Sequence, residues 1–184
     1  MVESVYQKAS QGHQGAERFT RAAGHFLDAV MHASPHGPPQ QRTVLEFSIA
    51  LEVLLVTGNS EASLQFRNGA AWLSGRNDAA RKAIHAHARD LYNAGSKYRH
   101  ADKLLSLYDS RDHDAPPASG KVFDIATGRA LVRKLLLPGL AVLDSGMQKS
   151  TADLCESAQY QAETGRWMSN VVDELYSSLQ PWHR

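Results

Sequence analysis

Apolar residues recur at three- and four-residue spacing along most of this chain, and this pattern limits the fold more than any other feature. Alternating apolar and polar runs, which are typical of strands, are absent. The spacing predicts helices over about 16–33, 41–56, 61–73, 79–108, 122–143 and 151–179. Because helix 41–56 is apolar on most sides, we expect it at the centre of a bundle. The predicted fold class is therefore an all-α bundle of about five to six helices.

The chain has 184 residues, which suits a single domain with a core that needs no disulfide. We place this core within 43–145 and expect the segment 150–180 to form a C-terminal helix, packed on the bundle or on a dimer partner. The polar, proline-containing stretch 109–120 is the best internal boundary.

The charge balance limits the possible partners of the protein. Lys and Arg number 20 and Asp and Glu number 19, so the formal net charge is only +1. Contact with nucleic acid therefore requires a local basic patch. The single cysteine, Cys155, cannot form an internal disulfide, which favours a reducing compartment. No apolar run approaches the ~20 residues that span a bilayer, so we predict a soluble, cytoplasmic protein that does not insert into membranes.

Polar chemistry is concentrated on the predicted helix 79–108. At helical spacing one face carries the basic residues, a hydroxyl and two imidazoles: Arg81, His85, Arg89, Ser96 and His100. Arginine binds phosphate through its planar fork, and histidine titrates near neutral pH and suits acid–base catalysis. The alternative is that this face is simply the solvated side of an amphipathic helix.

The sequence offers little support for a metal, a cofactor or other catalytic motifs. His85 and His87 are two residues apart and do not share a helix face, and neither CxxC nor HExxH occurs. There is no GxxxxGK[ST] loop for phosphate and no GxSxG elbow for a hydrolase. We therefore expect no metal and no cofactor.

Three segments in a fixed order carry a family resemblance. The apolar run 45–55 contains Glu52, the segment 66–73 contains Arg67, and the run 91–100 reads LYNAGSKYRH. This order, over about 43–107, resembles the HEPN superfamily of helical domains and its ApeA-like branch. In that branch a helix glutamate and an Arg-containing segment precede a motif of Leu-Tyr, two residues, Arg-Ser, three residues and His. Here Gly95 stands where the family has its arginine.

The resemblance implies a metal-independent endoribonuclease of the toxin or anti-phage defence type, in which two subunits pair around one cleft. It implies that His100 is the catalytic histidine, assisted by Ser96, and that Arg99 or Arg89 replaces the missing arginine. The further phosphate-binding candidates are Arg81, His85 and Lys97. The supporting candidates are Glu52, Arg67 and Tyr92.

Two functional interpretations follow. In the first, the protein is a homodimeric HEPN-like module with weakened or lost catalysis, which binds RNA, nucleotides or a protein partner such as an antitoxin. In the second, it is an active endoribonuclease that uses His100 and Ser96 with a substitute arginine. Glu52 has a simpler alternative role, which is to pair with Arg67 or Arg81 inside the bundle.

Overall fold

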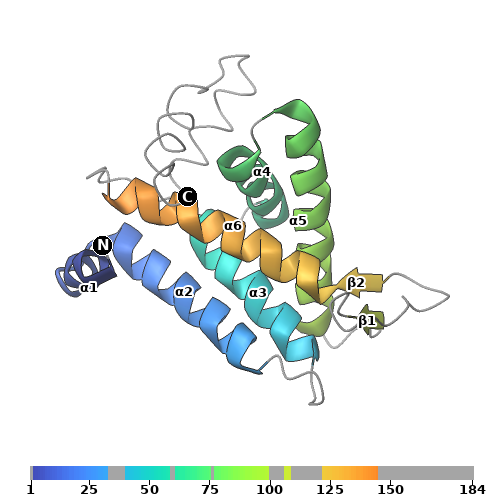
Figure 1. Cartoon of the computed structure of the whole chain (residues 1–184), viewed down its shortest axis with the longest axis horizontal. Helices are drawn as coiled ribbons and strands as arrows, with labels where there is room; N and C mark the ends of the chain where they lie inside the picture. The colour runs from blue at the N-terminus through green and yellow to red at the C-terminus, as the bar shows by residue number, and fades with distance from the viewer. Residues whose placement is uncertain are drawn as a thin grey trace, which may run out of the picture.

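The computed structural model describes residues 2–32, 40–58, 61–75, 77–99, 106–108 and 122–144. This part of the chain forms a helical bundle, as predicted, with two very short strands at one end (Figure 1). The helices are α1 (Val2–Ser10), α2 (Gln14–His32), α3 (Gln40–Leu55), α4 (Ala62–Ser74), α5 (Asp78–Arg99) and α6 (Ile125–Asp144). The strands are β1 (Ser106–Tyr108) and β2 (Val122–Asp124).

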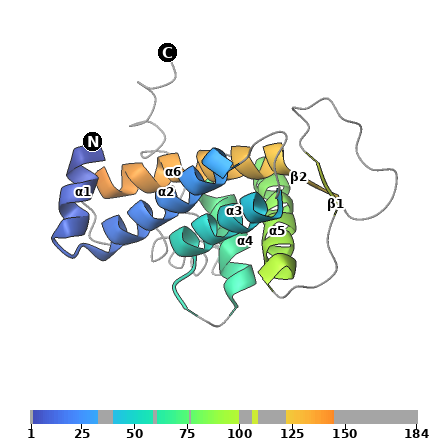
Figure 2. The same cartoon turned by 90° about the horizontal axis from the view of Figure 1, so that it is seen from below.

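Helix α3 lies at the centre of the bundle, which confirms the prediction from its apolar composition. It contacts α2, α4, α5 and α6, and Figure 2 shows it between the α2–α6 side and the α4–α5 side. Phe47, Leu51 and Leu54 on α3 are at most 1% exposed. Full burial of such a side chain contributes about 1.5–3 kcal/mol, so α3 supplies much of the hydrophobic stabilisation. The Phe47 ring stacks on Phe26 of α2, with centroids 5.9 Å apart.

The predicted helices differ from those of the structure in three places. Helix α1 was not predicted: Val2, Val5, Tyr6 and Ala9 follow helical spacing, but the helix has only nine residues. The predicted helix 79–108 ends at Arg99, and residues 106–108 instead form β1, which pairs in parallel with β2. The predicted helix 122–143 begins only at Ile125. Each strand has three residues, which is too short for an alternating pattern to show.

Side chains fix where two of the helices begin. The Asn77 side-chain oxygen accepts a hydrogen bond from the backbone N–H of Ala80 (2.9 Å) and so caps α5. The Asp124 carboxylate accepts from the backbone N–H groups of Ala126 and Thr127 (both 3.1 Å) and from the Thr127 hydroxyl (2.6 Å). Asp124 therefore ends β2 and caps α6.

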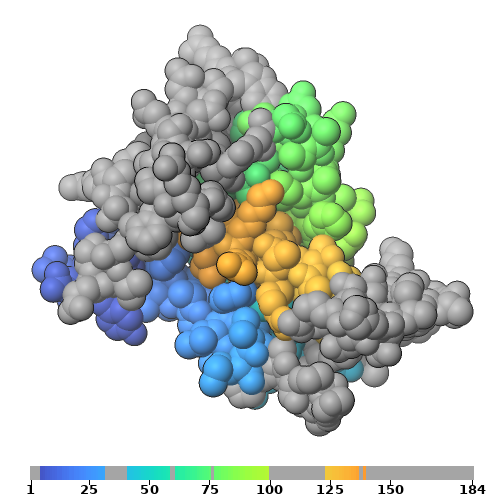
Figure 3. All heavy atoms as spheres, viewed as in Figure 1, coloured from blue at the N-terminus to red at the C-terminus, as the bar shows by residue number. Residues whose placement is uncertain are grey.

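In the space-filling view, α2, α6 and α5 share the visible face (Figure 3). Within the described ranges no helix is both long and apolar enough to cross a membrane.

Several predicted features lie outside the described residues: His100, Cys155, the boundary 109–120 and the helix 151–179.

Candidate anion-binding site

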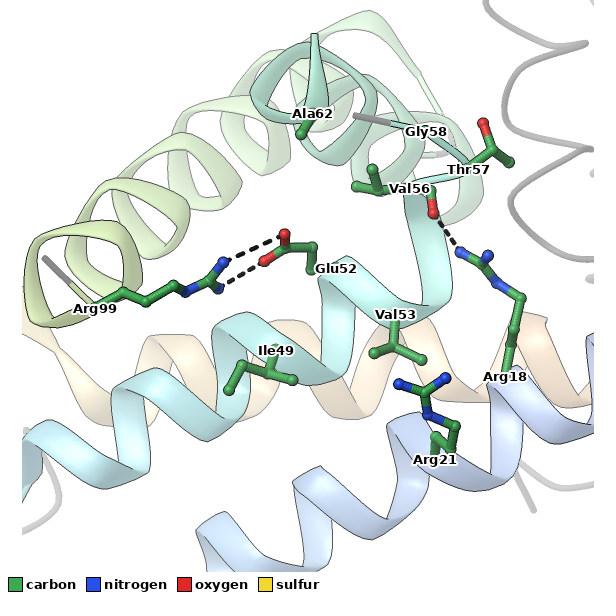
Figure 4. Close-up of a pocket in the computed structure, with 10 residues that line it drawn as sticks. All are labelled: Arg18, Arg21, Ile49, Glu52, Val53, Val56, Thr57, Gly58, Ala62 and Arg99. Carbon is green, nitrogen blue, oxygen red and sulfur yellow. Dashed lines mark hydrogen bonds and ion pairs between the residues drawn. The ribbon is translucent and has the colours of Figure 1, made fainter. Parts of the chain in front are cut away.

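A pocket of about 610 Å³ lies where α2, α3, α4 and α5 approach one another (Figure 4). Its walls also include the residues that directly follow α3. The lining residues are Arg18, Arg21, Ile49, Glu52, Val53, Val56, Thr57, Gly58, Ala62 and Arg99. Because three of its four ionisable side chains are arginines, we call it the arginine pocket.

One face of α3 and the segment that follows it form the apolar wall of the pocket. Ile49, Val53 and Val56 are four and three residues apart and therefore point to the same side. Arg18 and Arg21 stand three residues apart on α2 and face this wall (Figure 4). The pocket thus combines an apolar wall with a cationic edge.

An ion pair between Glu52 and Arg99 joins α3 to α5 at the pocket. The Arg99 Nη2 atom lies 2.6 Å from Glu52 Oε2, and Nη1 lies 3.3 Å from Oε1, so the fork is bidentate. The hydrogen bond to Glu52 raises the pKa of Arg99, although partial burial opposes this shift. The Arg99 side chain remains 41% exposed and that of Glu52 28%. The expected pairing of Glu52 with Arg67 or Arg81 was therefore wrong.

The two α2 arginines are held differently. Arg18 donates a hydrogen bond from Nη2 to the backbone carbonyl of Val56, just beyond the end of α3. Carbonyls at a helix C-terminus lack partners within the helix and carry partial negative charge, so this contact is favourable. The Arg21 side chain is exposed and forms no ion pair with another described residue. Its guanidinium is therefore available to a ligand.

A second basic group lies on α4 and α5, outside the arginine pocket. Burial lowers the pKa of His85, and the charges of Arg67 and Arg89 lower it further. These three predicted residues therefore lie close together. Arg67 Nε donates to the Ser63 carbonyl (3.0 Å), and Arg89 Nε lies 3.1 Å from a carboxylate oxygen of Asp90.

Two other predicted site residues make packing contacts. The Arg81 guanidinium lies 4.6 Å from the centre of the Trp72 ring and 3.7 Å from the Asp78 carboxylate. Its side chain is only 19% exposed. The Tyr92 ring meets Phe66 edge-on, with centroids 5.2 Å apart. The contacts with Trp72 and Phe66 join α5 to α4. Neither Arg81 nor Tyr92 lines the arginine pocket.

Gly95 lies at a very close approach of α5 to α3. It is buried, and a Cβ atom at this position would lie closer than 3.0 Å to both Cβ and Oγ of Ser48. An arginine at position 95 would therefore require the two helices to separate. The next residue, Ser96, is half-buried and makes no hydrogen bond with another described residue, and Lys97 is also half-buried. Neither residue lines the arginine pocket.

The structure therefore brings together two predicted residues, Glu52 and Arg99, with two that sequence reasoning missed, Arg18 and Arg21. The only local signal for the missed pair was two arginines three residues apart on one helix. That spacing is common on solvated helix faces, so it does not single out a site. Their position at the pocket follows only from the packing of α2 against α3.

The arrangement can hold an anion. Within the described part of the chain, no group of three or more His, Cys, Asp or Glu side chains is arranged to bind a metal ion. No protein-family model, no curated protein and no solved structure matches this chain.

Proposed function

We propose that this protein binds RNA or nucleotides in the arginine pocket, as a HEPN-like domain whose catalysis is weakened or lost. The observation that carries this proposal is the convergence of Arg18, Arg21 and Arg99 on one pocket. These arginines come from two helices far apart in the sequence, and an apolar wall faces them. Guanidinium groups beside an apolar surface suit a ligand that carries both phosphate and a base.

The low net charge of +1 supports a local mode of binding. A single strand bound through Z phosphate contacts has an affinity that falls with salt at a logarithmic slope of about −0.7Z. With at most three arginines at the pocket, the slope should be about −2 or shallower. A protein that binds through a broad basic surface would show a much steeper slope.

The test compares two arginine substitutions by fluorescence anisotropy with a labelled single-stranded RNA. Arg21→Ala should weaken binding about tenfold. A hydrogen bond to a charged group contributes about 1.5–3 kcal/mol, and the exposed position of Arg21 places its contribution at the lower end of this range. Arg133→Ala removes an exposed arginine of α6 that does not line the pocket and should leave binding unchanged. The unfolding midpoint of both variants should match that of the unaltered protein.

Equal effects of the two substitutions would contradict the proposal, because binding would then depend on total charge. Absence of any RNA or nucleotide binding would also contradict it. In either case the search for function would move to protein partners.

A second candidate function is metal-independent RNA cleavage that uses His100 and Ser96. It is favoured by one observation: Arg99, which directly precedes His100 in the sequence, lines the pocket together with Glu52. In this mechanism the histidine moves a proton and an arginine stabilises the charged phosphorane. Cleavage of mixed RNAs in EDTA that disappears in His100→Ala would support this alternative. Gly95→Arg is not a clean test, because position 95 is packed against Ser48.

A second subunit is part of the proposal, because the resemblance implies paired domains. The exposed apolar side chains of Leu27 (59%) and Met31 (74%), one turn apart on α2, support an additional contact of this kind. Light scattering coupled to size-exclusion chromatography measures the mass in solution. A mass of one chain at every concentration would refute the dimer and leave the binding proposal intact.

A further inference from the structure

The charge of the arginine pocket points to a ligand with two negative charges. The lining side chains include three guanidinium groups, those of Arg18, Arg21 and Arg99, and one carboxylate, that of Glu52, so their formal charges sum to +2. An internal phosphodiester of a nucleic acid carries one negative charge. A phosphomonoester carries about −1.5 to −2 at pH 7 and presents three acceptor oxygens. The monoester is therefore the better match in charge.

The remaining walls suit a nucleoside attached to that phosphate. Ile49, Val53 and Val56 form the apolar wall beside the α2 arginines, and Ala62 of α4 also lines the pocket (Figure 4). The volume of about 610 Å³ lies within the usual range of about 300–1,000 Å³ for small-molecule pockets. Inorganic phosphate would occupy only part of this space and would leave the apolar wall unused.

The ion pair of Glu52 with Arg99 limits which guanidinium groups an incoming anion can use. Glu52 repels any anion in the pocket, and its charge is already bonded by the Arg99 fork. An incoming anion must therefore draw most of its stabilisation from the two α2 guanidiniums, that of the exposed Arg21 and that of Arg18, which already donates to the Val56 carbonyl. A group with more charge and more acceptor oxygens gains more from these two guanidiniums than a diester does.

We propose that the arginine pocket recognises the terminal phosphate of an RNA together with its last nucleotide, and not an internal position of the strand. This inference rests on the proposed function and narrows it to one class of ligand, a nucleotide phosphomonoester. A 5′-phosphate and a 3′-phosphate share this chemistry, and the experiment below separates them.

The test uses one RNA sequence with an internal fluorescent label in three forms: hydroxyl groups at both ends, a 5′-phosphate, or a 3′-phosphate. Anisotropy titrations are run in EDTA, and the length of the RNA is checked on a gel afterwards. At least one phosphorylated form should bind ten times more tightly than the hydroxyl-ended form, or better. Arg21→Ala should remove most of this gain, and Arg133→Ala should keep it.

The outcomes separate this inference from the proposed function. If all three forms bind with equal affinity, terminal recognition is wrong and RNA binding in general stands. If no form binds, both are wrong. A competition arm tests the apolar wall: adenosine monophosphate should displace the phosphorylated RNA at a concentration at least tenfold lower than inorganic phosphate does. Equal displacement by the two competitors would refute the role of the nucleoside.

Discussion

The contact between Gly95 and Ser48 makes a sharp prediction about stability. Alanine at a helix position usually stabilises a protein by about 1 kcal/mol relative to glycine. At position 95, however, the new Cβ would lie closer than 3.0 Å to two Ser48 atoms, whereas carbon atoms prefer separations of about 3.5–4.0 Å. Ser48 Cβ is fixed to the α3 backbone and cannot rotate away, so relief requires the helices to separate.

The magnitude follows from these opposing effects. Overpacking a core typically costs about 1–3 kcal/mol, and a clash with a backbone-fixed atom belongs at the upper end. After the helix gain of about 1 kcal/mol, Gly95→Ala should lower the free energy of unfolding by about 2 kcal/mol. Gly24 provides the matched control, since a Cβ there would meet nothing within 4 Å. Gly24→Ala should raise the free energy of unfolding by about 0.5–1 kcal/mol.

Urea unfolding followed by far-UV circular dichroism measures both variants. A double substitution adds a direct check on the cause: Ser48→Gly removes both clashing atoms and should restore most of the loss caused by Gly95→Ala. If Gly95→Ala stabilises the protein as Gly24→Ala does, the close approach of α5 to α3 is wrong. The position of Arg99, one turn further along α5, would then be wrong with it.

Three further predictions concern single side chains. The buried Ser48 hydroxyl has no hydrogen-bond partner among the described residues, so Ser48→Ala should leave the free energy of unfolding in urea equal or higher. The equally buried Ser74 hydroxyl donates to the Ala70 carbonyl (2.8 Å), so Ser74→Ala should lower the free energy of unfolding by about 1 kcal/mol. Asp124→Ala should cost about 1–2 kcal/mol through loss of the α6 cap, measured in the same way, and an unchanged midpoint would refute the capping role. The pKa of His85 is lowered from its ordinary 6.5 in the folded state, so the unfolded chain binds more protons just below pH 6.5 and stability falls as the pH drops through this window. His85→Gln should therefore lose less stability than the unaltered protein between pH 7.5 and 5.5, and identical losses would refute this assignment.

The sequence predicted the features of this fold that depend on local spacing. The apolar residues around α3 predicted its central position, because a helix without a polar face must be covered on every side. Strands β1 and β2 were missed, since three residues carry no readable alternation and each paired residue lies 16 positions from its partner.

The candidate site shows the same limit at the level of single contacts. Glu52 was expected to pair with an arginine, either Arg67 or Arg81. Its partner is Arg99, 47 residues away, and only the packing of α5 on α3 selects this arginine over Arg67 or Arg81. Arg81 instead packs on Trp72, a contact between neighbouring helices that spacing alone does not choose.

The small apolar cluster beneath α1 has a consequence for how the molecule opens. Val5 and Ala16, with Ala9 beside them, form a small cluster of their own, and Phe19 packs against both this cluster and the main core. A helix of nine residues is marginal by itself, so α1 depends on these few contacts. Its amide hydrogens should therefore exchange with deuterium through local fraying, whereas the α3 amide hydrogens should exchange only through global unfolding. We therefore expect residues 2–10 to detach as one unit before the rest of the bundle opens.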